Sequence, residues 1–348
     1  MLAAAGRRSL VPAMRMRVRL ACCLLLAGHA APCQEPPAMR LDFPTANRAL
    51  LGDKPEAFFM GVDRGGSRVW QGGSFGFTRA PLLHEGGEIF TQFHEGTDIA
   101  PVERAADGTP LDEVRAMADG TVVFREERGG SGYGNQVLLR HDWDCGPVFT
   151  RYAHLSSVAV APGERVRRGQ KLGVLGSSGG RFEAARAHLH AEAALMLSTA
   201  EAAPARYESM NMAALNLEDL LRASQNGVLD ISAHARALPV DFIIETPRTG
   251  RPGLLRRHPW LEAAAHGGPA AGWRIHFTAW GFPARFEPLS EKPAAEQVTW
   301  VRPWTGLHTW RTRQMLTGQG ASAQIGPRGE VLLGLVFAAD GGTPEPLR

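Results

Sequence analysis

Short apolar runs separated by glycines fill residues 94–197 of this chain of 348 residues. The runs at 121–126, 136–141, 148–155, 166–175 and 188–195 have the length and the β-branched or aromatic content of strands. In residues 136–140 the apolar and polar positions alternate imperfectly, so we expect burial on both faces. Several short strands with regular turn signals predict an antiparallel β sandwich or barrel.

The flanking regions have different patterns. Residues 34–92 resemble an extended segment, with one strand predicted at 58–62 and turns at the glycines from Gly65 to Gly76. After residue 197, a cap at Asn216, acids in the first turn and a stop at Gly227 predict a short helix over 216–222. Strands are predicted at 240–245, 273–280 and 331–338. The expected fold is therefore mostly β, with a small β-rich (α+β) domain at the C-terminal end.

The first 30 residues have the composition of an export signal. They contain five arginines and no acid, followed by an apolar run at 20–27 and small residues at Gly28 and Ala30. The run is far shorter than the roughly 20 residues of a membrane-spanning helix, so no stable membrane span is expected. A start at Met14 or Met16 would give a signal of more usual length. We predict four parts: a signal peptide at 1–30, an extended segment at 31–85, a catalytic domain at 86–198 and an accessory domain at 199–348.

Composition adds two constraints. Hydrophobic residues make up 44% of the chain and charged residues 21%, which is ordinary for a globular protein. Without the five arginines of the signal, 33 basic residues face 35 acidic ones, so the formal charge of +3 becomes −2 and no basic field for nucleic acid is expected. Cys33 and Cys145 remain after the signal. Export permits a disulfide between them, but free thiols fit equally well, and Cys33 is a poor match to a lipid attachment site.

Three short segments, 93–98, 151–155 and 186–192, hold the candidate chemistry. His188 and His190 are two residues apart, so on a strand both rings point to one face. His94 and Asp98 are four apart, which on a straight strand is too far for shared ligation, so the chain must bend, and Gly96 can supply the bend. Two imidazoles and one carboxylate are the three ligands of a catalytic zinc site with one open position.

These segments, Phe-His-x-Gly-x-Asp, Tyr-Ala-His-Leu and His-Leu-His-x-Glu, closely resemble the lysostaphin-type zinc metalloendopeptidases that cut peptide cross-links in bacterial cell walls. The intervening residues 118–124, 132–135 and 163–173 agree with this family. The resemblance implies that His94, Asp98 and His190 bind one Zn²⁺ per chain. It also implies that His154 and His188 are the catalytic, unligated pair beside the zinc-bound water. Glu192 is either an outer acceptor for a ligand imidazole or an ordinary strand carboxylate.

The function that follows is hydrolysis of peptidoglycan peptides outside the cytoplasm, in the periplasm or beyond the cell, by attack of the zinc-bound water on the scissile carbonyl. The sequence leaves open which cross-link is cut, whether the N-terminal segment inhibits the enzyme, and the oligomeric state. Two loops, 100–112 and 177–186, are longer than the family pattern and should border the cleft.

Three alternative interpretations remain beside the enzyme. Some relatives of this type have lost the metal and bind cell walls or activate another hydrolase, although all five site residues are present here. Residues 163–170 also resemble a hairpin of biotinyl or lipoyl carriers, but Lys171 opens an apolar strand and does not occupy a hairpin tip. Six of the eight tryptophans follow Pro259, and they could form a sugar-binding face or, as we favour, part of a small β core.

Overall fold

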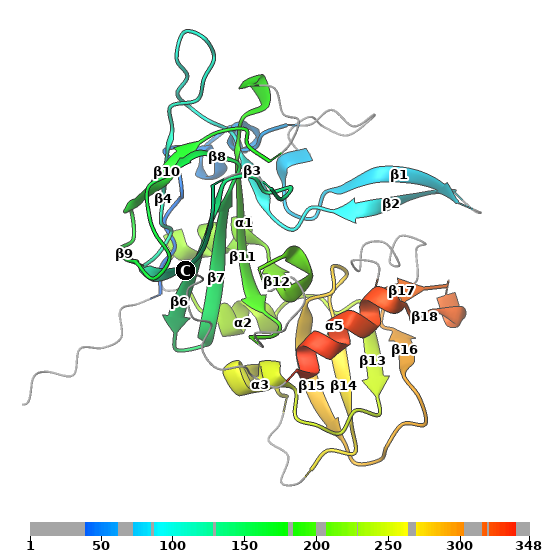
Figure 1. Ribbon diagram of the computed structural model, residues 1–348. Helices are drawn as coiled ribbons and strands as arrows, with labels where there is room; N and C mark the ends of the chain where they lie inside the picture. The colour runs from blue at the N-terminus through cyan, green and yellow to red at the C-terminus, as the bar shows by residue number, and fades with distance from the viewer. Residues whose placement is uncertain are drawn as a thin grey trace, which may run out of the picture. The chain divides into compact units, whose positions relative to one another are not determined.

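The computed structural model describes residues 39–61, 72–84, 87–127, 130–179, 184–199, 207–227, 229–263, 269–302, 315–318 and 320–338. The predicted signal peptide and Cys33 lie outside these residues. The main feature is a seven-stranded sheet of order β12-β11-β7-β6-β5-β9, with β3 also paired to β11. Its strands are β3 (Thr97–Ile99), β5 (Gly120–Glu126), β6 (Gln136–Trp143), β7 (Gly146–Ala153), β9 (Arg165–Val166), β11 (Leu189–Met196) and β12 (Met212–Leu215). Figure 1 shows β6, β7 and β11 side by side.

A smaller sheet covers part of this one. It has the order β4-β10-β8, with β4 (Glu113–Arg115), β8 (Leu155–Val158) and β10 (Lys171–Leu175). Apolar residues of both sheets, among them Val114, Leu172, Val137 and Leu139, belong to one buried core. Every strand pair within the two sheets is antiparallel. The predicted antiparallel, mostly β fold is confirmed, as two packed sheets and not as a closed barrel.

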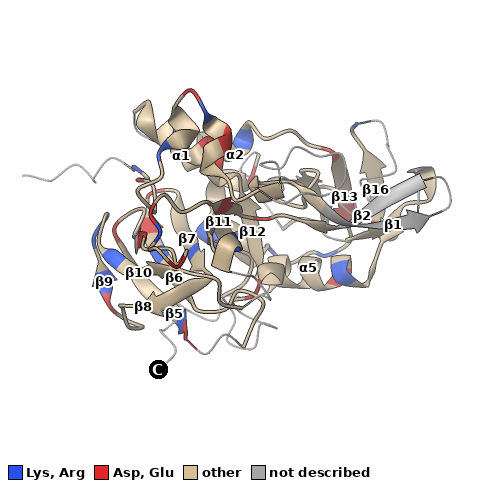
Figure 2. Ribbon diagram, turned by 90° about the horizontal axis from the view of Figure 1, so that it is seen from above, with Lys and Arg blue, Asp and Glu red and all other residues tan. Residues whose placement is uncertain are grey.

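Individual strands agree closely with the sequence pattern. Residues 136–139 of β6 are all buried, as their broken alternation predicted. The run predicted at 166–175 is divided into β9 and β10 by a turn at Gly169, whose φ of +78° suits glycine. Lys171 lies at the start of β10, where its Nζ is 2.9 Å from Glu113 Oε1 on β4. Both signs of charge occur close together around β9 and β10 (Figure 2).

The N-terminal segment differs from the prediction. The strand predicted at 58–62 does not form among the described residues: Phe58 ends the 3-10 helix η2 (Pro55–Phe58), and Phe59 makes only an isolated antiparallel bridge to Ile99 of β3. Val62 lies outside the described residues. Proline favours a helical first turn, and Phe58 and Phe59 are buried as consecutive residues, which a one-faced strand would not allow. A second short helix, η1 (Ala49–Leu51), precedes it. The unpredicted hairpin β1 (Thr78–His84) and β2 (Gly87–Phe93) leads directly to His94.

Beyond residue 207 the fold is mixed. The predicted short helix is α1 (Leu217–Gln225), and the side chain of Asn216 caps it by accepting from the backbone N–H groups of Glu218 and Asp219. An antiparallel sheet of order β15-β14-β13-β16 follows, formed by β13 (Phe242–Thr246), β14 (Gly272–Phe277), β15 (Pro283–Leu289) and β16 (Gln297–Trp300). Trp273, Ile275 and Phe277 of β14 share its buried face, as the alternation predicted. The remaining elements are η4 (Ala184–Arg186), η5 (Ser209–Asn211), α2 (Ile231–Arg236), α3 (Gly253–Arg257), η6 (Pro259–Leu261), β17 (Leu316–Thr317), η7 (Gly320–Ser322), β18 (Gln324–Ile325) and α5 (Pro327–Phe337).

The strand predicted at 331–338 is wrong, because residues 331–337 lie in helix α5, which ends at Phe337. Its buried residues Leu332, Leu333, Leu335 and Val336 follow the three-to-four-residue spacing of a helix face, while Gly334 between them is exposed. Pro327 at the first helical turn also favours a helix start. A short apolar run of this length is compatible with a strand or a helix, and the spacing of its buried residues favours the helix.

Residues on either side of position 198 pack together closely. Strand β12 pairs with β11, so the main sheet draws one strand from each side of the predicted boundary. Arg257 Nη2 donates to the carbonyls of Met196 and Leu197, at 3.0 and 2.8 Å. Within the described part of the chain, no helix combines the length and apolar character needed to cross a membrane.

Three tryptophans act as packing residues. The indole N–H groups of Trp260, Trp273 and Trp280 donate to the carbonyls of Cys145, Gly250 and Ala214, respectively. Cys145 is a half-buried free thiol in the β6–β7 turn, and burial raises its pKa to about 11. Trp300 packs against Phe242, with ring centres 5.8 Å apart. Trp304 and Trp310 lie outside the described residues, so the fold assigns internal contacts to four of the six tryptophans after Pro259.

Candidate active site

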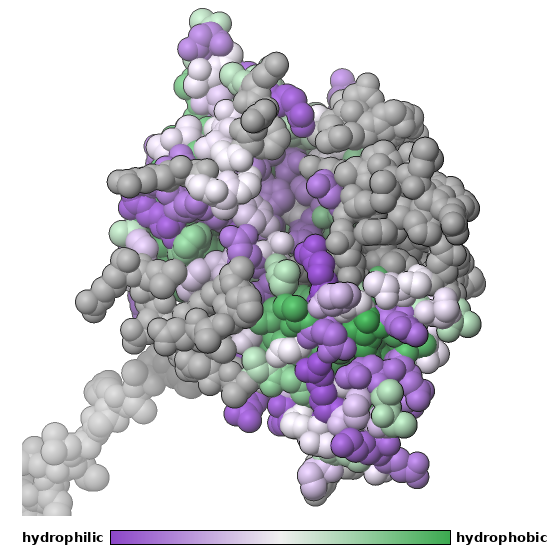
Figure 3. Space-filling model, turned by 45° about the vertical axis from the view of Figure 1, so that its right-hand side comes forward, coloured by the Kyte–Doolittle hydropathy of each residue, from purple (hydrophilic) through white to green (hydrophobic). Residues whose placement is uncertain are grey.

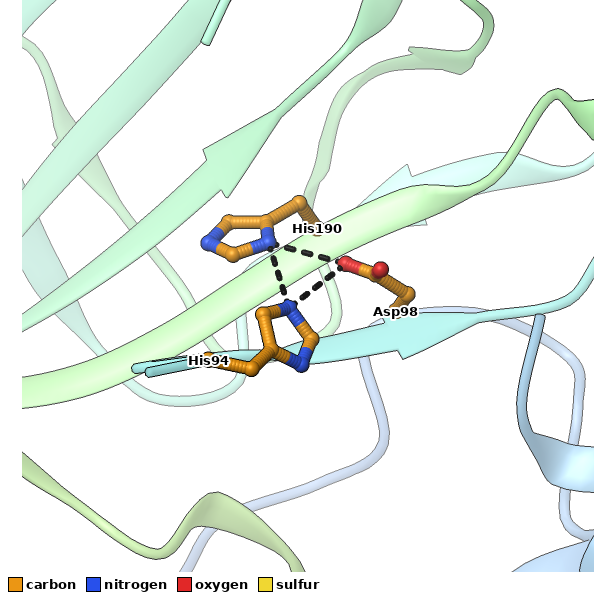
Figure 4. Close-up of side chains that lie close together, drawn as sticks. All are labelled: His94, Asp98 and His190. Carbon is orange, nitrogen blue, oxygen red and sulfur yellow. Dashed lines mark hydrogen bonds and ion pairs between the residues drawn. The ribbon is translucent and has the colours of Figure 1, made fainter. Parts of the chain in front are cut away.

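His94, Asp98 and His190 converge from three places in the chain. His94 follows β2, Asp98 lies in β3, and His190 lies in β11 directly opposite Asp98 in the strand register. His94 Nε2 and His190 Nδ1 are 3.0 and 2.9 Å from Asp98 Oδ1, and 3.3 Å from each other. Figure 4 shows these three atoms facing one another. All three side chains are buried, so the cluster is a site with a fixed shape.

Gly96 makes this approach sterically possible. The chain bends at Gly96 between His94 and Asp98, as the sequence predicted. A Cβ atom at position 96 would lie 2.7 Å from the His190 ring and 2.8 Å from the carbonyl oxygen of Ala191. Both distances are shorter than van der Waals contact. The glycine is therefore required by the closeness of β11 as well as by the bend.

Outer acceptors orient both imidazoles. His94 Nδ1 donates to the Ser74 carbonyl at 2.8 Å, and His190 Nε2 donates to Glu192 Oε1 at 2.9 Å. With these nitrogens protonated, the other nitrogen of each ring faces Asp98, and it offers a lone pair to a metal ion once it carries no proton. Two imidazole nitrogens and a carboxylate oxygen with such outer partners are the donor set and support of a three-ligand zinc site.

Glu192 belongs to a second layer, in which Glu192, Arg151 and Gln136 are buried. Its Oε2 accepts from Arg151 Nε at 2.9 Å, and its Oε1 accepts from Tyr133 Oη at 3.0 Å. Arg151 also donates to the side chain of Gln136 and the carbonyl of Tyr207, and its guanidinium lies 4.0 Å from the centre of the Tyr133 ring. This second layer holds the Glu192 carboxylate in place against the ring of His190.

The charges of these layers shift the pKa values strongly. Burial lowers the pKa of His190, but hydrogen bonds to Asp98 and Glu192 outweigh burial and raise it to about 9. Burial would raise the pKa of Asp98 and of Glu192. Instead, the neighbouring His94 and His188 hold the pKa of Asp98 well below its usual range. Arg151 does the same for the pKa of Glu192. The site is therefore an anionic environment that favours a cation, which a metal ion would satisfy.

His154 and His188 lie beside the cluster with one nitrogen engaged. Their Nδ1 atoms donate to the carbonyls of Ser178 and Arg186, at 2.8 and 2.7 Å. Their ring centres are 4.8 Å apart, and His188 Nε2 is 3.6 Å from Asp98 Oδ1. Burial, with the charges of His188 and His190, lowers the pKa of His154 to about 3, and burial lowers that of His188. Both rings are neutral at pH 7, so both Nε2 atoms can accept a proton.

The backbone at His154 is constrained. Its φ of +62° is the one positive value among the described non-glycine residues. The N–H of His154 donates to the Tyr133 carbonyl, and the next N–H, of Leu155, donates to the Asn135 carbonyl. A left-handed histidine held by its neighbours is typical of a functional position.

A cavity of about 350 Å³ opens onto the cluster. It is lined by His94, Asp98, Gly132, Tyr133, His154, Arg186, His188, His190 and Glu208. All five histidine and aspartate positions singled out in the sequence therefore meet at one cavity. On the face shown in Figure 3, hydrophilic side chains line a hollow beside a group of hydrophobic ones.

Sequence reasoning missed Tyr133, Arg186 and Glu208 as cavity residues. Tyr133 lies in the segment Gly-Tyr-Gly-Asn, which the sequence did single out, and Arg186 lies two residues before His188. Glu208 could not be anticipated because it follows the predicted domain boundary. The extended loop at 100–112 reaches this region through Arg104, which donates to the carbonyls of Ala184 and Ala185 just before Arg186.

Comparisons with known proteins agree with this site. Residues 92–200 match peptidase family M23. DD-carboxypeptidase/endopeptidase Mpg of Neisseria meningitidis is 41% identical over 119 residues, which are 34% of this chain and 23% of the relative. Peptidoglycan DD-endopeptidase ShyA of Vibrio cholerae is 38% identical over 100 residues, 28% of this chain and 20% of the relative. Murein hydrolase activator EnvC of Escherichia coli is 33% identical over 117 residues, 34% of this chain and 26% of the relative.

Solved structures include lysostaphin of Staphylococcus simulans, 22% identical, covering 60% of this chain and 78% of that one with a TM-score of 0.30. A zinc-containing peptidase from Vibrio cholerae is 30% identical, with coverages of 29% and 26% and a TM-score of 0.23. The chain spans about a quarter of the length of the curated relatives it matches. Residues 92–200 of this chain are therefore a domain of peptidase family M23, the lysostaphin-type peptidases.

Proposed function

We propose that this chain is an exported zinc metalloendopeptidase that hydrolyses peptide cross-links of bacterial peptidoglycan. The observation that carries the proposal is the convergence of His94 Nε2, Asp98 Oδ1 and His190 Nδ1 within 3.3 Å of one another. The proton on the far nitrogen of each ring is held by an outer acceptor, so the three atoms that face one another are the ones that would bind one zinc ion.

When bound there, zinc would supply Lewis acidity towards the scissile carbonyl and lower the pKa of a water molecule towards 7. The protein's own contribution is to hold and move protons. The neutral Nε2 of His154 or His188 can accept the proton of the attacking water. While protonated, that ring can stabilise negative charge on the carbonyl oxygen, and it becomes neutral again when it gives the proton to the leaving amine.

Several features support peptidoglycan as the substrate. The names of the Neisseria and Vibrio relatives describe carboxypeptidase or endopeptidase activity, in the Vibrio protein on peptidoglycan. A cavity of about 350 Å³ has room for a short peptide segment beside the cluster. Arg186 and Glu208 add one positive and one negative group to its wall. The apolar run and small residues of positions 1–30 support export to the compartment where this polymer occurs.

A second candidate is a non-catalytic module that activates another cell-wall hydrolase. It is favoured by one observation, the 33% identity to the Escherichia coli murein hydrolase activator. The complete set of His94, Asp98, His154, His188 and His190 favours the enzyme, because a module without catalysis has no need for two neutral histidines beside a ligand cluster.

The test uses purified residues 31–348, with metal content measured by elemental analysis and with digestion of purified peptidoglycan followed by separation of the products. We expect about one zinc ion per chain and loss of cross-linked peptides, both absent in His190→Ala. Zinc without cleavage, together with stimulation of an added cell-wall hydrolase, would favour the activator. Absence of zinc from the wild-type protein would contradict the enzyme.

A further inference from the structure

The segment that carries His94 and Asp98 is weakly attached to the main sheet. Hairpin strand β2, which leads to His94, pairs with β1 and with no strand of the main sheet among the described residues. Strand β3, with Asp98, pairs with β11 over only three residues. The His94 backbone N–H and C=O instead bond to Phe77 and Gly76, so residues 74–77 and 93–97 form one unit.

Glu218 forms hydrogen bonds with both parts of this unit. Its Oε1 accepts from the Phe75 backbone N–H at 2.7 Å and from Thr97 Oγ1 at 3.2 Å. Thr97 directly precedes Asp98. Phe75 directly follows Ser74, whose carbonyl orients the His94 ring. The carboxylate of Glu218 thus bonds to the residue just before Asp98 and to the residue just after Ser74.

The ring of Trp280 packs against the same unit. It stacks on Phe93, with centres 6.4 Å apart and planes 10° apart, and contacts Phe75 edge-on at 5.5 Å. Phe93 directly precedes His94. The indole N–H of Trp280 donates to the Ala214 carbonyl on β12, which pairs with β11, the strand of His190. The tryptophan therefore ties the His94 side of the cluster to the His190 side.

Burial makes the contact between Glu218 and Thr97 specific. Thr97 is fully buried and Glu218 is 8% exposed, so neither finds a substitute partner in water. Ligand geometry must be held within about 0.5 Å by residues whose own positions are fixed. Helix α1, with its cap at Asn216, supplies that fixed position for Glu218.

We propose that Glu218 and Trp280 are positioning residues for the metal site, and that residues beyond 207 are required to hold His94 and Asp98 in place for zinc. This inference rests on the proposed function, in which His94, Asp98 and His190 bind zinc. It gives the C-terminal part a role in metal binding that its sequence did not indicate. A chain ending near Leu197 would lack β12, Glu218 and Trp280 together.

The test compares matched variants of purified residues 31–348 stripped of metal. Zinc dissociation constants are measured by competition with a chelator, and thermal midpoints are measured without metal. Glu218→Ala and Trp280→Phe should each weaken zinc binding about 10- to 100-fold, the range seen when outer support of ligands is lost. The controls are Asp219→Ala, which changes the neighbouring exposed acid, and Trp273→Phe, which removes an equivalent indole-to-carbonyl bond far from the site.

The controls should retain wild-type zinc affinity even where their thermal midpoint falls. Thr97→Val removes only the hydroxyl that Glu218 accepts from, and it should weaken zinc binding in the same direction if Glu218→Ala does not fold. Glu218→Gln, which retains an acceptor oxygen, should restore much of the affinity.

Equal zinc affinity in wild type, Glu218→Ala and Thr97→Val, with only the midpoint lowered, would overturn the inference and leave the proposed function intact. A wild-type protein that binds no zinc would instead remove the proposed function, and this inference with it.

Discussion

Asp98 and His190 lie directly opposite each other on β3 and β11, and 2.9 Å separates Asp98 Oδ1 from His190 Nδ1. Opposite residues of an antiparallel pair have Cβ atoms about 4.5–5.5 Å apart, so the sheet itself brings these two side chains together. The third member, His94, depends on the bend at Gly96. The site is therefore built on one rigid contact and one tightly packed turn.

Substitution of any of these three residues should abolish zinc binding. His94→Ala, Asp98→Ala and His190→Ala each leave two donor atoms, and a three-ligand site then loses most of its affinity. Elemental analysis after dialysis should find about one zinc ion in the wild type and essentially none in each variant. Full occupancy in His190→Ala would show that the ligand set has been misassigned.

His154→Ala and His188→Ala should separate binding from chemistry. Both rings are bonded through Nδ1 to backbone carbonyls and are assigned to proton transfer. Zinc content should stay near one per chain, while kcat on a cross-linked peptide falls about 10²- to 10³-fold. Loss of zinc from either variant would mean that a catalytic histidine and a zinc ligand have been exchanged in the assignment.

The sequence predicted the site better than the fold around it, for a physical reason. His188 and His190 lie on one strand face because side chains alternate, and the bend at Gly96 followed from the spacing of His94 and Asp98, so short-range geometry accounts for these two pairs. The family resemblance, and not the spacing, implied that the three segments and His154 form one site. Glu218 and Trp280 reach the site across more than a hundred residues. No local pattern encodes such contacts.

The two wrong strands have a similar explanation. Residues 331–338 and 58–62 are short apolar runs, for which periodicity alone does not separate strand from helix. Pro327 and Pro55, each at the first turn of the helix that forms, were the available signals. The strands at 78–84 and 87–93 were missed because apolar and polar residues do not alternate regularly in these two segments.

Glu192→Gln should weaken zinc binding without removing it. The amide retains an oxygen that can accept from His190 Nε2 but loses the charge that balances buried Arg151. Loss of outer-layer support typically costs about 10- to 100-fold in metal affinity. Chelator competition measures the change. Glu126→Gln is a suitable control, because Glu126 accepts from Gln136, which in turn accepts from Arg151, but Glu126 lies away from the ligands. Equal losses in both variants would contradict the role of Glu192.

The last prediction concerns acid stability and uses His141, which lies outside the metal site. This ring is fully buried in the main sheet, where Nδ1 donates to the Asp119 carbonyl at 2.7 Å and Nε2 is 2.8 Å from Thr150 Oγ1. Burial lowers its pKa from 6.5 to about 4. Between these two values the unfolded chain binds a proton that the folded protein does not, so the free energy of unfolding falls as the pH falls.

The stabilising contribution of neutral His141 is complete above pH 6.5 and is lost by about pH 4, and a difference of about 2.5 in pKa corresponds to about 3 kcal/mol. Urea unfolding at several pH values from 7.5 to 4.5, with chelator present so that metal release does not contribute, gives the slope of stability against pH. His141→Gln replaces the ring by a group that does not titrate. Its slope of unfolding free energy against pH should therefore be shallower than that of the wild type, by up to the slope that one bound proton contributes. The other histidines titrate identically in both proteins, and the difference therefore reports His141 alone. Parallel slopes would show that His141 does not resist protonation in the fold.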